Sequence, residues 1–305
     1  MFTLTVLGSG SAGNCALLTT EHCRLLVDAG LSARQTVARL AQVGVAPDEL
    51  DGVLLTHEHC DHASGLDVLC RKFKELPIYC NALTAEVLRH DGGCLAKHGN
   101  WHLFKTGGDF EIKDIAVQTF PVPHDAVDPV GYMFHHGQAA LGYLTDLGFA
   151  TKLVHERVRT ATTLLIETNH DSALLSADTK RPWSVKQRIM SRHGHLSNEA
   201  AAAVVAQMLA GGAKLRRAVL GHLSRDCNRP DLAIHTMRTQ GGEGAATLEI
   251  IAASQAEISA RLTVEERAPD PIQIEPAAPR VAEASAAPVK NRDTLQLDLF
   301  GALAV

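Results

Sequence analysis

The sequence has no CxxC pair, and its seven cysteines are odd in number. Neither a disulfide framework nor a four-thiolate zinc site is therefore indicated, and we expect reduced, mostly structural thiols. No stretch approaches the ~18 uncharged apolar residues that a membrane span needs. The N-terminus also lacks a basic segment followed by an apolar run and a small-residue cleavage site. We therefore expect a cytoplasmic protein that has no membrane partner.

An excess of basic charge is also absent from the chain as a whole. The formal net charge of −5 argues against a protein that coats nucleic acid by bulk charge. Between residues 180 and 230, however, ten Lys and Arg face two acids, which gives a local balance of 10 − 2 = +8. We call this stretch the basic sector. It is a candidate docking surface for a polyanion, and scattered solvated side chains are the alternative interpretation.

The composition is otherwise that of a globular protein, with 46% hydrophobic residues among 305, and it changes past about Leu262. Five of the twelve prolines lie between residues 269 and 288, and no aromatic residue appears there before Phe300. Such a segment cannot form a core. We predict a folded domain over residues 1–262 and a Pro/Ala-rich tail over 263–305, with a disordered linker at roughly 263–294.

Within the predicted domain, short β-rich runs alternate with helical patterns. Strands are predicted at 4–7, 16–20, 24–28, 52–56, 115–121, 131–135, 140–145, 163–167, 218–222 and 248–252. Helices are predicted at 33–42, 82–90, 183–192, 198–210 and 231–240. The early strands follow one another directly and the later ones are separated by helices. The fold class is therefore mixed α/β with two groups of strands.

One apolar strand ends in an HxHxDH motif that carries His57, His59, Asp61 and His62. On an extended segment His57 and His59 point to the same side, so that one metal ion can bind both. Asp61 and His62 follow the turn and can face a second metal. Imidazole and carboxylate at this density favour a zinc-type site over a solvated His-rich loop.

Three further candidate ligands each follow a predicted strand. They are His124, Asp146 and His222. Each alone is compatible with an ordinary polar residue at a strand end. Together with the HxHxDH motif they complete a set of seven ligands for two metal ions, with Asp146 as the bridge.

With these motifs, the chain resembles the metallo-β-lactamase-fold hydrolases over residues 1–255, and among them the WalJ/YycJ group of nucleases. The closer resemblance rests on the runs GSGSAGNC at 8–15, ETNHD at 167–171, GHLSN at 194–198 and GHLS at 221–224, in addition to the HxHxDH motif. The family implies an αββα sandwich with a dinuclear metal site at the sheet edges. It also implies hydrolysis of a phosphodiester with two divalent ions, zinc or manganese.

The opening glycines also fit GxGxxG, with Asp28 twenty residues after Gly8. That dinucleotide fingerprint requires a helix after the glycines, whereas the sequence predicts a β-hairpin there. We therefore reject a Rossmann domain. Two interpretations of these glycines remain: they form a tight turn close to the metal site, or they simply lead into the hairpin.

Other polar residues are candidates for contact with substrate. His195 lies in the GHLSN run, and in related phosphodiesterases a histidine in a similar motif faces the scissile phosphate, so we assign it with Asp61 to catalysis. Asn169, His170, Ser197 and Arg225 are assigned to substrate binding. Ser197 is alternatively the N-cap of the helix that follows, and His195 a structural residue of that capping loop.

The segment close to the chain end resembles the bacterial sliding-clamp-binding peptide. Its residues are Gln296, Leu297, Asp298, Leu299 and Phe300. In such peptides the Gln occupies one subsite and the Leu-Phe pair fills an apolar pocket. A linker of about thirty residues spans roughly 30 Å or more, which would hold the catalytic domain near DNA within the clamp. A stray amphipathic end, or one that folds back onto the domain, is the alternative.

These features together predict a dimetal phosphodiesterase that acts on DNA, as a 5′-to-3′ exonuclease recruited to replication or repair by the sliding clamp. One alternative is an enzyme of the same fold that acts on RNA or on a small cyclic phosphodiester. Another, of a different class, is a non-catalytic accessory protein bound to the clamp. The complete ligand series argues against this last alternative.

Overall fold

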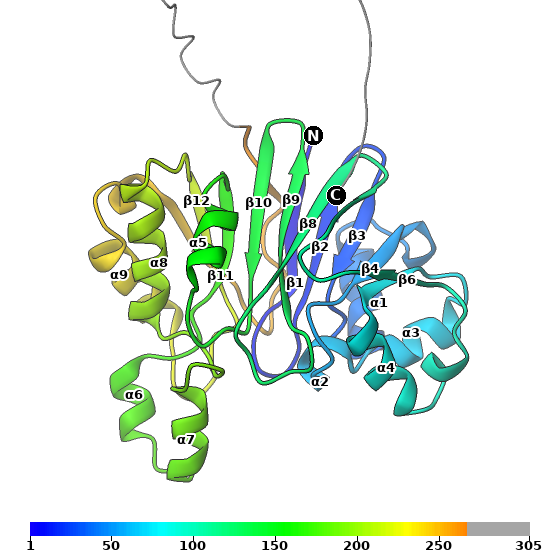
Figure 1. The fold of residues 1–305 in the computed structure, drawn as a ribbon, viewed down its shortest axis with the longest axis horizontal. Coiled ribbons are helices and arrows are strands. Elements are labelled where there is room, and N and C mark those ends of the chain that lie inside the picture. The colour runs from blue at the N-terminus through cyan, green and yellow to red at the C-terminus, as the bar shows by residue number, and fades with distance from the viewer. Residues whose placement is uncertain (267–305) are drawn as a thin grey trace, which may run out of the picture. The chain divides into compact units, whose positions relative to one another are not determined.

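The computed structural model describes residues 1–266 of the chain. The predicted linker from residue 267 onward and the peptide Gln296 to Phe300 lie outside the described residues. The described part has two seven-stranded sheets, ordered β14-β1-β2-β3-β4-β5-β6 and β13-β12-β11-β10-β9-β8-β7. Helices cover the outer face of each sheet, which gives the four-layered αββα sandwich that the family resemblance implied (Figure 1).

The first sheet joins an antiparallel hairpin to a parallel half. Its strands are β1 (Thr3–Gly8), β2 (Cys15–Thr19), β3 (Arg24–Val27), β4 (Gly52–Leu54), β5 (Ile78–Asn81), β6 (Trp101–Phe104) and β14 (Leu262–Thr263). Neighbours from β3 to β6 are parallel, and β1 pairs antiparallel with both β2 and β14. Its outer face carries α1 (Ala33–Gln42), α3 (Leu66–Lys72) and α4 (Ala82–His90).

The second sheet also combines parallel and antiparallel strands. Its strands are β7 (Asp109–Ile112), β8 (Ile115–Pro121), β9 (Val130–His136), β10 (Ala139–Leu144), β11 (Thr163–Glu167), β12 (Arg217–Gly221) and β13 (Glu249–Ala252). Strands β10 to β13 are parallel, whereas β7 to β10 form an antiparallel meander. Its outer face carries α5 (Lys152–Val158), α8 (Asn198–Ala210) and α9 (Pro230–Gln240), while α6 (Ser172–Ala177) and α7 (Trp183–Ile189) project at one end.

The inner strands are apolar on both faces, which explains their continuous hydrophobic runs. In β1, Leu4 and Val6 pack into the core between the two sheets, and Leu7 packs into the core beneath the helices of the first sheet. A third core lies between the second sheet and its helices. Among the described residues, none of the helices is both long and apolar enough to cross a membrane.

All ten predicted strands are present, and the structure adds β5, β6, β7 and β14. The added strands are two to four residues long, and β6 is only half-buried at the sheet edge, so that their hydrophobic patterns are weak. Helix α7 ends at Ile189 rather than at residue 192. Strand β14 crosses the boundary predicted at residue 262, and Val264 is buried behind it. The folded part therefore continues at least to Glu266.

Candidate metal centre

The candidate ligands gather where strands of both sheets end at the same edge. Three of these strand ends are followed by a non-glycine residue in the left-handed region, at φ values of 62° for Asp28, 56° for Asp146 and 54° for His222. Asp and His adopt this conformation more readily than most residues, although it is strained. Such strain concentrates at functional sites. Here it turns each strand end sharply towards the site.

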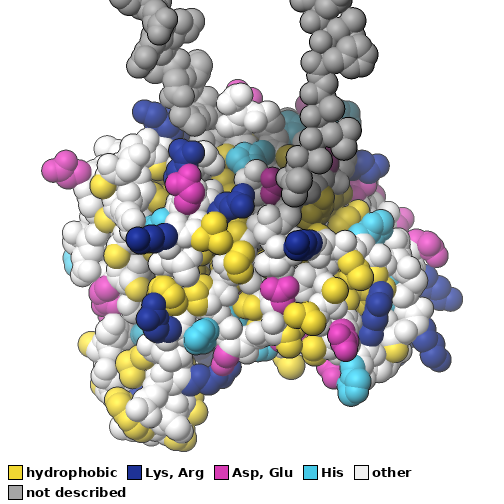
Figure 2. All heavy atoms as spheres, in the orientation of Figure 1, with side chains coloured by type: hydrophobic (Ala, Val, Ile, Leu, Met, Phe, Trp, Pro, Cys, Tyr) yellow, Lys and Arg dark blue, Asp and Glu magenta, His cyan; other side chains and the backbone are white. Residues whose placement is uncertain are grey.

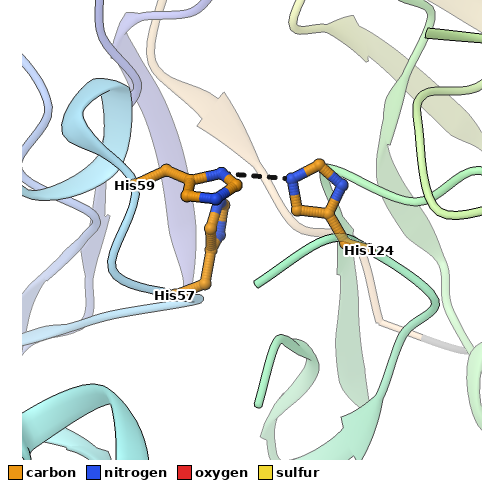
Figure 3. Close-up of side chains that lie close together, drawn as sticks. All are labelled: His57, His59 and His124. Carbon is orange, nitrogen blue, oxygen red and sulfur yellow. Dashed lines mark hydrogen bonds between the residues drawn. The ribbon is translucent and has the colours of Figure 1, made fainter. Parts of the chain in front are cut away.

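Three imidazoles form a first group, which we call the three-histidine cluster. It contains His57 and His59 from the loop after β4, and His124 from the loop after β8 (Figure 3). His59 Nδ1 lies 3.3 Å from His124 Nε2. His57 Nε2 is buried and has no hydrogen-bond partner among the described residues. The ring nitrogens of all three face a common point.

This geometry fits a metal ion better than it fits hydrogen bonding. His124 Nδ1 donates to the Gly194 carbonyl at 3.1 Å, which leaves Nε2 of the neutral ring as a bare acceptor. A tetrahedral ion with bonds of about 2.0–2.1 Å holds adjacent ligand nitrogens about 3.3 Å apart, which matches the observed separation. Burial lowers the pKa of His57 and of His124, so that both remain neutral and able to bind a cation.

Two carboxylates and two imidazoles form a second group, the mixed cluster. Its members are Asp61, His62, Asp146 and His222, whose ligand atoms lie within 4.8 Å of one another. Asp146 Oδ2 is 3.0 Å from His62 Nε2, and Asp61 Oδ2 is 3.2 Å from His222 Nε2. Asp146 Oδ1 also lies 3.8 Å from His124 Nε2 of the three-histidine cluster. Asp146 is therefore placed to reach both groups, as a bridging ligand must be.

Two buried carboxylates orient these ligands, and the sequence analysis gave neither of them a role. Asp28 accepts from His62 Nδ1 at 2.8 Å and from the Thr56 hydroxyl, which lies 3.0 Å from His57 Nδ1. Glu167, at the end of β11, accepts from His222 Nδ1 at 2.9 Å. A carboxylate behind a histidine fixes the ring and its tautomer. Both residues end strands of the predicted set, but this position alone is too weak a signal to assign them a role.

His195 lies beside the clusters, as its assignment to catalysis requires. Its ring centroid is 5.2 Å from those of His124 and His222. Its Nδ1 donates to Glu167 Oε1 at 2.7 Å, and its side chain is 18% exposed. Burial opposes charge on this ring, but Glu167 raises the pKa of His195 above its ordinary value. His195 can therefore present an Nε2–H group to a substrate.

The glycine-rich turn after β1 leads into the β2 hairpin, so the rejection of a Rossmann domain is confirmed. Asn14, at the end of this turn, binds the segment of the HxHxDH motif. The Asn14 backbone N–H donates to the Asp61 carbonyl at 2.7 Å, and the Asn14 side-chain nitrogen lies 3.1 Å from His62 Nε2. The loops approach so closely that a Cβ on Gly30 would overlap the Asp61 carbonyl. The turn is therefore part of the wall of the site.

The residues assigned to substrate binding fall into different environments. Asn169 is 4% exposed and donates to the His222 carbonyl, so its side chain supports the turn after β12. His170 is equally buried, and its Nδ1 has no partner among the described residues. Ser197 is the N-cap of α8 and accepts from Ala200 N at 3.2 Å. Arg225 is exposed. For Asn169 and Ser197 the structure gives a structural role, because their polar atoms bind the protein itself.

The basic sector does not form a continuous unpaired surface. Six of its ten cations make ion pairs: Lys180, Arg181, Arg188, Arg216, Arg217 and Arg229. Lys186 donates to the Ser176 carbonyl, and Arg192 lies over the Phe149 ring. Only Lys214 and Arg225 have no such partner among the described residues. Figure 2 shows basic side chains scattered among acidic and apolar ones on one face.

The cysteines agree with the expectation of structural thiols. All seven are free, and five of them are buried. Burial raises the pKa of the Cys15 thiol well above its ordinary value and that of Cys80 to about 12, which keeps both protonated. The exposed thiol is Cys60, within the HxHxDH motif.

Comparisons with known proteins agree with this geometry. The β-lactamase superfamily domain matches residues 23–223. The chain is 38% identical to exodeoxyribonuclease YycJ of Bacillus anthracis over 229 residues, which cover 75% of this chain and 85% of that protein. It is 38% identical to exodeoxyribonuclease WalJ of Streptococcus pneumoniae over 241 residues, which cover 78% of this chain and 88% of that protein.

Among solved structures, the metallo-β-lactamase-fold protein YhfI of Bacillus subtilis superposes with a TM-score of 0.65 at 19% sequence identity. The match covers 85% of this chain and 100% of that one. At this identity the likeness concerns the fold alone. The family match, the coverage of the two relatives and the gathered ligand set lead to one conclusion: this chain belongs to the β-lactamase superfamily and is a metal-dependent hydrolase.

Proposed function

We propose that the protein is a DNA exonuclease that degrades a strand from its 5′ end with two divalent ions, zinc or manganese. The observation that carries the proposal is the pair of clusters joined by Asp146, with His195 at their side. The exodeoxyribonuclease names of the two relatives support DNA as the substrate. One metal ion in a single cluster would support hydrolysis in general. Two neighbouring ions, one in each cluster, suit displacement at phosphorus, because they can act on both the attacking and the leaving oxygen.

In this proposal His57, His59 and His124 hold one ion, and Asp61, His62 and His222 hold the other, with Asp146 between them. The bound ions would lower the pKa of a water and offset negative charge on the phosphate oxygens. Asp61 also orients the attacking water. His195 donates a proton from Nε2 to the departing oxygen, and Glu167 holds its ring at Nδ1. Burial would raise the pKa of Glu167, but His195 and His222 lower it to about 2, so that it stays ionised.

The test is digestion of single- and double-stranded DNA, labelled at either end, with manganese or zinc. We expect mononucleotides released from the 5′ end by the wild type, and a loss of at least about 10³-fold in Asp61→Ala, because a metal ion supplies several kcal/mol of charge stabilisation. Asp91→Ala, at an exposed position just after α4, is the matched control. Cleavage of RNA or a cyclic dinucleotide, with no cleavage of DNA, would contradict the choice of substrate.

We also propose that the peptide from Gln296 to Phe300 recruits the enzyme to the sliding clamp. Its support is the sequence pattern and its distance of about thirty residues from the folded domain. Replacement of Leu299 and Phe300 by Ala should abolish binding of the full-length protein to purified clamp, measured by calorimetry. Leu303→Ala is the control within the same tail. Unchanged binding in the double variant, or no binding by the wild type, would contradict this assignment.

A further inference from the structure

A cavity of about 430 Å³ lies against the turn after β12, and its lining includes Leu223, the residue that follows His222. Its walls include Ser9, Ser11, Ser224, Arg225, Asn228 and Gln255. Ser9 in its lining connects it to the mixed cluster, because the His222 backbone N–H donates to Ser9 Oγ at 2.7 Å. Arg225 follows His222 by three residues, so the two Cα atoms are at most about 11 Å apart.

We propose that this cavity binds the terminal nucleotide of a 5′-phosphorylated DNA strand, with the terminal phosphate against Arg225. The inference rests on the proposed function and specifies which end of the substrate the site selects. It also gives a reason for exonucleolytic action. The volume of about 430 Å³ suits a single nucleotide, so that a strand end would occupy the cavity rather than the interior of a strand.

The charges in the cavity select Arg225 as the phosphate ligand. Arg181 also lines the cavity, but its guanidinium donates to Asp178 at 2.8 Å and to Asp226 at 3.0 Å. Its charge is therefore already compensated. Arg225 has no ion pair among the described residues, and its planar guanidinium suits bidentate contact with a phosphate.

The remaining walls combine hydrogen-bonding groups with apolar surface. The Asn228 and Gln255 amides already bind the protein, which fixes the shape of the wall. The Ser11 and Ser224 hydroxyls can still donate to a sugar or a base. Leu223, Ala252 and Ala253 supply apolar contacts. Since no aromatic ring lines the cavity, a base would be held without strong stacking, which predicts little preference among the four bases.

The chemistry of the reaction is consistent with this placement. Water oxygen bonds to the phosphorus between the first and second nucleotides, and the bond from that phosphorus to O3′ of the first nucleotide breaks. O3′ takes a proton, and the first nucleotide leaves with its own 5′-phosphate. The shortened strand retains the attacked phosphate at its new 5′ end. Each cycle therefore regenerates the group that the cavity recognises.

The kinetic test uses full-length protein and 3′-labelled single strands that carry either a 5′-phosphate or a 5′-hydroxyl. We expect the wild type to have a kcat/KM at least tenfold higher on the phosphorylated strand, and Arg225→Gln to bring this ratio close to one. Arg238→Gln, an exposed arginine on α9 outside the cavity, should retain the wild-type ratio. A wild-type ratio near one, or an unchanged ratio in Arg225→Gln, would overturn the proposal.

A binding test separates this inference from the proposed function. Calorimetry with deoxythymidine 5′-monophosphate should show binding by the wild type, weakened at least fivefold in Arg225→Gln and in Ser11→Trp, which fills the cavity from an exposed position. Thymidine should bind more weakly than the monophosphate. If DNA is not cleaved but this pattern holds, the proposed function fails and the cavity assignment stands. If DNA is cleaved but neither variant weakens binding, only the cavity assignment fails.

Discussion

The three-histidine cluster and the mixed cluster lie side by side, but they balance charge in opposite ways. The first has three imidazoles and no carboxylate of its own. The second has Asp61 and Asp146 among its members, and the carboxylates of Asp28 and Glu167 behind its two histidines. The first cluster therefore has no carboxylate of its own to offset the charge of a bound cation, whereas the second has several.

That difference appears in the proton affinity of the histidines. Burial lowers the pKa of His57 and His124. His62 and His222 are buried as deeply, yet Asp146 and the other carboxylates around them raise their pKa well above the ordinary value. The mixed cluster therefore favours proton binding when no cation is present, and a metal ion would compete with those protons. The comparison shows that equal burial gives opposite protonation when the neighbouring charges differ.

The largest effect is expected from Asp146→Asn, which changes the residue common to both clusters. We expect hydrolysis to fall by at least about 10³-fold, because loss of the shared carboxylate disturbs both metal positions and the charge stabilisation they supply. Steady-state rates, together with metal content measured by elemental analysis, check this. The control is Asp91→Asn. Retention of two ions and of activity would show that the clusters do not depend on a common ligand.

A smaller effect, mainly on metal affinity at the mixed cluster, is expected from Asp28→Asn. Loss of the carboxylate that orients His62 should weaken metal binding at the mixed cluster by about 10–100-fold. The three-histidine cluster should change less, since Asp28 reaches His57 only through Thr56. Titration against a competing chelator would resolve the two affinities. Equal weakening at both clusters would mean that they are coupled more tightly than these contacts indicate.

The smallest effect concerns pH. Because the pKa values of His62 and His222 are raised, these rings are protonated near pH 7, and metal binding at the mixed cluster must release their protons. Affinity there should rise with pH until the raised pKa values are passed. At the three-histidine cluster, where the pKa values of His57 and His124 are lowered, affinity should depend less on pH. Calorimetry in buffers of different ionisation enthalpy counts the protons released, and equal counts at both clusters would contradict this difference.

Much of the site could be predicted from residue order. Alternation along an extended segment placed His57 and His59 together, and each further ligand followed a hydrophobic run that is a strand in the structure. The roles of Asp28 and Glu167 could not be predicted in this way. Each contacts histidines between 28 and 55 residues away, and nothing local distinguishes them from other acids at strand ends. Ser197 was ambiguous for a related reason, since a hydroxyl before a helix serves equally as a cap or as a ligand.

The sequence by itself determined the chemistry: the ligand types, their attachment to strand ends, and the family of folds that can present them. It did so because strand periodicity and metal preference are local properties of the chain. Only the tertiary structure decided which histidines have lowered and which have raised pKa values, which basic side chains are already paired, and where a cavity forms against the turn that carries His222. Those properties depend on burial and on charges brought together from distant segments, and they exist only when both sheets have packed.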